Sequence, residues 1–278
     1  MRPLSFFGRS ASAAFGCSGP TFRGTVFVPV FFALLSSLPA IAAPRDFPFT
    51  WTGKTAAQGQ SSLELWFTPR LVRTADYFRL DTRAVWTHGV ASNVDTQISL
   101  DLDFQRTDFT QGVEPKFTSL WRFTTWRDKS PFAVAGIGRV SLGLDQVEFE
   151  GRLVADLHID RVVLALNFSA SRSLFWNNRV DIDTRLEENL GLKYSISKGV
   201  AAGLEFRAKS AWQVREYQGT AFYVGPAMTF THPKFWITLG AFAQVAADRP
   251  KVDEALPEPA VFRDNERFVL RLIFGADV

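Results

Sequence analysis

The chain has 278 residues, of which 46% are hydrophobic and 21% are charged, a balance that is typical of folded proteins and excludes a disordered chain. Its 31 basic and 28 acidic residues are interleaved, so no basic block indicates nucleic acid as a partner. The sequence contains no phosphate-binding loop, zinc motif or dinucleotide fingerprint, and we therefore expect no cofactor.

Residues 1–42 have the pattern of a cleaved signal peptide. Their charges are all basic, and an apolar stretch at 26–38 is followed by Ala40 and Ala42, the small residues of a cleavage site. A retained N-terminal anchor is the alternative, but Pro29 and Pro39 near the two ends of the stretch argue against it. We expect cleavage after Ala42.

The mature chain is then expected to contain no cysteine. Cys17 is the only cysteine and precedes the apolar stretch, whereas a lipoprotein cysteine would follow it. A chain without cysteines crosses an oxidising compartment without disulfide errors. We expect residues 43–59 to form an N-terminal periplasmic segment ahead of the folded domain.

Segments of alternating polarity follow. In 96–105, Ile98 and Leu100 point to one face and Ser99 and Asp101 to the other, an order that a strand produces and a helix does not. Twelve such strands, within a range of 10–14, are predicted near 61–70, 76–87, 94–106, 116–127, 131–143, 146–159, 162–172, 183–196, 200–213, 219–231, 235–246 and 265–276.

The connections between these segments alternate in length. They are short after the second, fourth, sixth, eighth and tenth segments and mostly longer after the others. The short connection near Asp145 breaks the pattern, and the acidic, proline-containing segment 247–265 is the longest. Outer-membrane barrels alternate short periplasmic turns with longer external loops in this way. We expect 247–265 to be an exposed loop that either constricts the lumen or forms a contact surface.

These patterns predict an all-β fold, a closed antiparallel transmembrane β-barrel over residues 60–278. The last segment places Phe268, Leu270 and Phe274 on one face, and it must pair with the first strand to remove the open edge. Both termini would lie in the periplasm. A soluble β-sandwich is the alternative. Tryptophans near strand ends are expected to form an aromatic belt at the membrane interface: Trp66, Trp86, Trp121, Trp126, Trp176, Trp212 and Trp236.

The chain resembles Gram-negative outer-membrane barrels of about twelve strands, a likeness that extends over most of 60–278. More narrowly, Tyr223–Ala227 and Phe235–Gly240 form a hairpin similar to one in the transporter-like barrels linked to phenol-degradation meta-pathway operons. The broader resemblance implies an outer-membrane location, contact with membrane lipids and insertion by the barrel-assembly machinery. The narrower one implies uptake of small hydrophobic compounds.

Charged residues of the strands are predicted to line the lumen. A Lys or Arg at the bilayer midplane of a barrel's outer face costs about 2–4 kcal/mol, so these side chains must point inward. The two signs nearly balance among them. The candidates are Arg79, Asp81, Arg83, Asp101, Asp103, Arg122, Glu148, Glu150, Arg152, Asp156, Arg185, Glu187, Glu205, Arg207, Lys209 and Arg271.

Two functions fit this interior. A passive channel or transporter for a small-molecule solute would use the opposed charges to set a transverse field. A lumen closed by salt bridges would instead make the barrel a structural or surface-interaction scaffold. We favour the channel. An enzyme is not expected, because His88, His158 and His232 lie at strand ends and form neither a hydrolase motif nor a metal-ligand cluster.

Overall fold

The computed structural model describes residues 45–71, 78–106, 111–125, 130–176, 182–213, 216–248 and 266–278. Each of the twelve predicted segments coincides with a strand, so the predicted strand count is confirmed for this part of the chain. The strands are β1 (Ser61–Leu71), β2 (Phe78–Ala91), β3 (Val94–Arg106), β4 (Gln111–Thr124), β5 (Phe132–Gly143), β6 (Gln146–Ile159), β7 (Val162–Phe175), β8 (Ile182–Ser197), β9 (Val200–Gln213), β10 (Glu216–His232), β11 (Phe235–Asp248) and β12 (Phe268–Asp277). The described residues include no helix that could cross a bilayer. The expected signal peptide and most of the 247–265 loop lie outside them.

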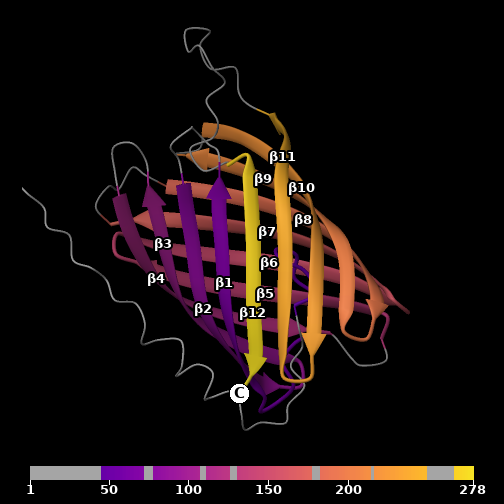
Figure 1. Ribbon diagram of the computed structural model, residues 1–278. Helices are drawn as coiled ribbons and strands as arrows, with labels where there is room; N and C mark the ends of the chain where they lie inside the picture. Colours follow the sequence, from indigo (N-terminus) through magenta and orange to yellow (C-terminus); the bar gives the residue numbers. More distant parts are fainter. Residues whose placement is uncertain are drawn as a thin grey trace, which may run out of the picture. The chain divides into compact units, whose positions relative to one another are not determined.

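The strands form one closed antiparallel barrel in which each strand pairs with its sequence neighbours (Figure 1). Closure comes from β1 and β12, whose pairs include Ser62 with Asp277 and Leu65 with Phe274. The ring therefore has no open edge, and the backbone N–H and C=O groups of its strands find partners within the wall, as a bilayer requires. The prediction of a closed barrel is confirmed.

Two-residue turns join the strands at one end of the barrel. They are Ser92–Asn93, Asp160–Arg161, Lys198–Gly199 and Pro233–Lys234. Asp160 has a positive φ of 48°, a conformation that Asp tolerates better than most residues. We call this end of the barrel the turn end and the opposite end the loop end. At the loop end, Leu144–Asp145 is the short connection expected between β5 and β6.

The two faces of the wall have the reverse polarity of a soluble protein. Large apolar side chains such as Leu100, Leu164 and Leu204 are exposed on the outer face, whereas Ser99 and Asp101, on either side of Leu100, are buried inside. Burying polar side chains while exposing apolar ones is unfavourable in water and is the arrangement of a barrel in lipid.

The belt prediction is wrong for two tryptophans. Trp66 and Trp236 are buried inside the barrel, at 5% and 2% exposure, whereas Trp86 and Trp121 are exposed on the outer face. Trp66 is two residues from the buried Glu64 and Thr68 of β1, so its side chain points to the same inward face and away from lipid. The ring of Trp236 lies over Gly275, where any Cβ would clash with it. Trp126 is outside the described residues.

Candidate functional site: a plugged lumen

A segment ahead of the first strand occupies the lumen, and we call residues 45–56 the plug. Residues 46–53 are all buried, although they belong to no strand. The sequence predicts a periplasmic segment ahead of the barrel over 43–59; residues 45–56 lie inside the barrel instead, and residues 57–59 are exposed. The physical reason is that Phe47, Phe49 and Trp51 would expose large apolar rings to water outside, whereas the lumen buries them.

The plug is joined to the wall at the turn end. The Gly59 N–H donates to the Gly89 carbonyl at 2.8 Å, and the Gly89 N–H donates to the Gln60 carbonyl at 2.9 Å. Residues 57–60 therefore lead directly into β1 at that end. At the other end of the plug, Arg45 contacts Glu64, near the start of β1, at 2.9 Å. Both ends of the plug thus lie toward the turn end.

Wall side chains bind the plug's main chain near its middle. The Glu205 carboxylate of β9 accepts the backbone N–H of Phe49 at 3.2 Å and of Thr50 at 2.7 Å, together with the Thr50 hydroxyl at 2.7 Å. Asn167 of β7 pairs with both main-chain groups of Trp51, accepting its N–H at 2.6 Å and donating to its carbonyl at 2.8 Å. Hydrogen bonds to a buried charged acceptor are among the stronger ones in proteins.

The second half of the plug is held in the same way. Asp156 of β6 accepts the Gly53 N–H at 3.1 Å, and Asp95 of β3 accepts the Ala56 N–H at 3.0 Å. Asp95 also forms a buried ion pair with Arg122, which donates to the Thr52 carbonyl at 3.3 Å. Five strands, β3, β4, β6, β7 and β9, therefore hold the main chain of the plug.

The plug's aromatic rings fit into spaces left by small wall residues. Phe47 packs with Val163 and Ala165 and lies against Gly191, where a Cβ would come within 2.8 Å of the ring. Phe49 meets Phe242 edge to face, with ring centroids 4.9 Å apart. A larger residue at position 191 would occupy the space that Phe47 takes.

Arginines stack on the same rings. Arg45 lies between Trp51 and Trp66, with its guanidinium carbon 4.0 and 4.3 Å from the two ring centroids. Arg207 and Arg271 lie over Phe49 at 3.9 and 3.7 Å. Such cation–π contacts stabilise most where water is excluded, so they add to the fixation of the plug.

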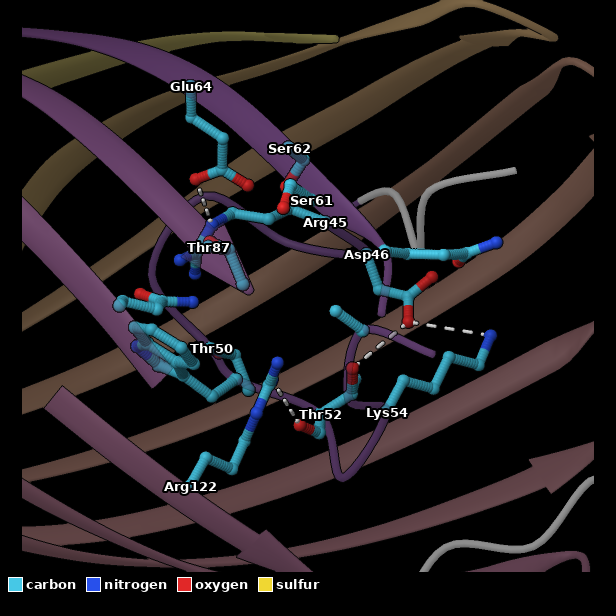
Figure 2. A pocket seen from close by; sticks show the side chains of 14 residues that line it. Arg45, Asp46, Thr50, Thr52, Lys54, Ser61, Ser62, Glu64, Thr87 and Arg122 are labelled. Atoms are coloured by element: carbon cyan, nitrogen blue, oxygen red, sulfur yellow. Dashed lines mark hydrogen bonds and ion pairs between the residues drawn. The ribbon is translucent and has the colours of Figure 1, made fainter. Parts of the chain in front are cut away.

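Charged side chains at the start of the plug are paired as well (Figure 2). Arg45 reaches Glu64 of the wall, while Lys54 and Thr52 converge on Asp46. Asp46 also forms a buried ion pair with Lys193 of β8. A small pocket of about 40 Å³ remains between the plug and the wall of β1–β4, and its lining is mainly polar, with Gln60, Ser62, Thr87 and Gln97 among its residues.

The sixteen predicted lumen residues all lie on the inward-facing side of their strands. Six of them contact the plug directly: Arg122, Arg152, Asp156, Glu205, Arg207 and Arg271. Most of the others are joined in ion pairs closer to the loop end. These pairs include Arg79 with Asp81 and Asp103, Arg83 with Asp101, Arg152 with Glu150, and Arg185 with Asp183.

The histidines are not brought together. His158 pairs with Asp156 at 2.6 Å, His88 with Ser61 at 2.9 Å, and His232 stacks on Phe235. Within the described ranges, no three His, Cys, Asp or Glu side chains form a group that could hold a metal ion.

The sequence interpretation missed the plug and two residues that hold it, Asp95 and Asn167. Phe47, Phe49 and Trp51 alternate with other residues as in a strand, and this was the available signal. Asn167 is a polar residue in the otherwise apolar run that begins β7, which also marks it.

Comparisons with known families, curated proteins and solved structures differ in what they show, and the solved structures support the fold. A family of unknown function, DUF6662, matches residues 154–278. No curated protein matches the chain. Solved structures that resemble it are the COG4313 outer membrane channel from Pseudomonas putida F1 (TM-score 0.58, 9% identity, 81% of this chain and 98% of that one), the NanC porin (0.54, 8%, 78% and 100%) and the KdgM porin in complex with disordered oligogalacturonate (0.51, 8%, 77% and 98%). The chain thus has the fold of outer-membrane channel and porin barrels.

Proposed function

We propose that the chain is an outer-membrane channel for small molecules and that the plug holds its lumen closed. The observation that carries the proposal is that the wall closes without the plug: β1 pairs directly with β12, and the plug adds no strand to the ring. Departure of the plug would therefore open the lumen without breaking the barrel. The apolar outer face supports the membrane location, and the resemblance to channel and porin barrels supports the general role.

All the described contacts between the plug and the wall are noncovalent and can therefore break and form again. The plug is held by hydrogen bonds, ion pairs and ring packing, and both of its ends lie toward the turn end. A segment attached in this way can leave toward that end while it stays connected to β1. The proposal assigns no catalytic role to the chain.

A closed scaffold is the second candidate, and the ion pairs across the lumen favour it. Arg139 contacts Glu148 and Glu150, and Arg79 bridges Asp81 and Asp103. If these pairs and the plug were permanent, the barrel would carry no solute and would act through its external loops.

A reversible disulfide between the plug and the wall distinguishes the channel from the closed scaffold. A Cβ at Gly53 would lie 2.9 Å from the Ala133 Cβ of β5, so a small retreat of the plug allows a disulfide between Gly53→Cys and Ala133→Cys. The mature chain is expected to contain no other thiol. We expect no current steps from the oxidised double variant in a planar bilayer, and discrete steps after reduction. The two single variants serve as controls and should not respond to reductant.

Each outcome has a definite meaning. Silence of the wild type and of the reduced variant, with insertion and heat-modifiable mobility verified, would overturn the channel and favour the scaffold. Equal conductance in the oxidised and reduced states would instead retain the channel and reject the plug as its gate.

A further inference from the structure

Two cations in the lumen have no carboxylate partner in the part of the chain that the structure describes. Lys209 of β9 stands opposite Glu187 of β8 in the strand register. That carboxylate is already engaged by Arg207 at 3.2 and 2.9 Å and by the Asn189 amide at 2.9 Å. Lys209 is left without an ion pair among the described residues.

Arg271 of β12 is the second cation. Its guanidinium donates to the Thr68 hydroxyl at 3.0 Å and to the Pro48 carbonyl at 3.1 Å, and it lies over the Phe49 ring. All of these partners are neutral, and two of them belong to the plug. An arginine inside a protein usually gains a carboxylate or phosphate partner, because its planar fork of donors matches two oxygens.

The other cations near the loop end differ from these two. Arg70 contacts Asp81 at 2.5 Å and Glu266 at 3.6 Å, while Arg83 and Arg152 each contact a wall carboxylate. Arg207, two residues from Lys209 on the inward face of β9, lies over the same Phe49 ring as Arg271, so Lys209 and Arg271 border the same part of the lumen. Lys209 and Arg271 are only partly buried, so a solute in the lumen could reach them.

We propose that Lys209 and Arg271 form a binding site for an oxyanion group, a carboxylate or a phosphate, of a small solute. The inference deepens the proposed function by naming the class of solute. An oxyanion on Arg271 would compete with the Pro48 carbonyl and the Phe49 ring for the guanidinium. Binding would therefore weaken the hold of the wall on the plug, and the solute would favour opening of its own path.

Binding can be measured on the closed protein. Citrate and inorganic phosphate are titrated separately into the refolded mature chain in detergent, at low ionic strength, and heat release is recorded. We expect saturable binding of at least one of these anions. Lys209→Gln should weaken it by about tenfold or more, the usual effect of losing one charge-assisted contact. Lys234→Gln, at an exposed turn outside the lumen, is the matched control and should bind like the wild type.

The two anions identify the solute chemistry. Preference for citrate would assign carboxylates, and preference for phosphate would assign phosphorylated solutes. No saturable binding of either anion, or equal binding by wild type and Lys209→Gln, would overturn the site. Arg271→Gln is a second variant if Lys209→Gln loses its heat-modifiable mobility.

Failure of this site and failure of the channel are distinguishable. A chain that conducts ions after release of the plug but binds no anion retains the proposed function and loses the site. A chain that binds citrate through Lys209 but never conducts retains the site and loses the channel. In bilayers, citrate should raise the open fraction of the wild type but not that of Lys209→Gln.

Discussion

The two halves of the lumen use similar residues for different purposes. Toward the turn end, Asp156 and Glu205 accept hydrogen bonds from the plug's backbone N–H groups. Toward the loop end, Asp81 and Glu150 pair with arginines of neighbouring strands. A carboxylate that accepts backbone N–H groups fixes a peptide, and one that meets a guanidinium only balances charge within the wall. Closure of the lumen by the plug should therefore depend on residues of the turn-end half and hardly on those of the loop-end half.

The largest expected effect comes from filling the space that Phe47 takes. In Gly191→Leu the new side chain would overlap the ring, and overpacking of this kind typically costs about 1–3 kcal/mol. The conducting fraction should rise by about one to two orders of magnitude in single-channel recordings. Gly136→Leu is the matched control: Gly136 is on the outer face with no atom near its missing Cβ, so the variant should stay as closed as the wild type. If Gly191→Leu and Gly136→Leu opened equally, the packing of Phe47 against Gly191 would not be what holds the plug.

Neutralising the central acceptor should have the next largest effect. In Glu205→Gln one acceptor oxygen is replaced by an NH₂ group that faces the N–H donors of Phe49 and Thr50. The remaining oxygen of Gln can still accept one hydrogen bond, so the loss lies near the lower end of the range for a bond to a buried charge, about 1.5 kcal/mol, and the open fraction should rise about tenfold. Glu148→Gln, in the loop-end half beside Arg139, is the control and should leave closure unchanged. If Glu148→Gln raised the open fraction more than Glu205→Gln, the loop-end half and not the turn-end half would control closure.

Acid should weaken the plug through Asp46, which lies outside the strands. Burial raises the pKa of this carboxyl, but the charges of Lys54, Lys193 and His158 oppose that rise, and the pKa ends below its ordinary value of 3.8. A group with a lowered pKa in the docked state stabilises docking above its ordinary pKa, and this stabilisation is lost as the pH falls below about 3.8.

Open fraction measured against pH tests this expectation. The wild type should open more as the pH falls through that range, whereas Asp46→Asn should open several-fold more at neutral pH and lose this part of the acid response. An identical acid response in the two proteins would exclude Asp46 as its source.

The smallest effect is expected at Lys54. Its ammonium is 3.8 Å from Asp46 and the side chain is one third exposed, and exposed ion pairs contribute about 0–1 kcal/mol. Lys54→Gln should change the open fraction by less than about fivefold, and Lys193→Gln, which removes the buried partner of Asp46, should change it more. A larger effect of Lys54→Gln than of Lys193→Gln would show that solvent exposure does not determine how strongly these ion pairs hold the plug.

The strands could be predicted because desolvation acts on every residue of the wall and produces a local alternation of polarity. The polar Asp101, which points inward, directly follows the apolar Leu100, which points outward. The plug could not be read in this way. Phe49 and Glu205 are 156 positions apart, and no local pattern shows that they meet. The belt prediction failed for Trp66 because it lies in the middle of β1 and not near an end, and because it shares its inward face with Glu64.

Disulfide formation in intact cells tests the occupied lumen most directly. The full chain carrying G53C and A133C is expressed, outer membranes are isolated without reductant, and the crosslinked fraction is measured by mobility and mass spectrometry. Most of the protein should crosslink, while a control pair of G53C with S141C, farther up β5 toward the loop end, should not. A heat-modifiable barrel in which the first pair crosslinks no more than the control would contradict the plug.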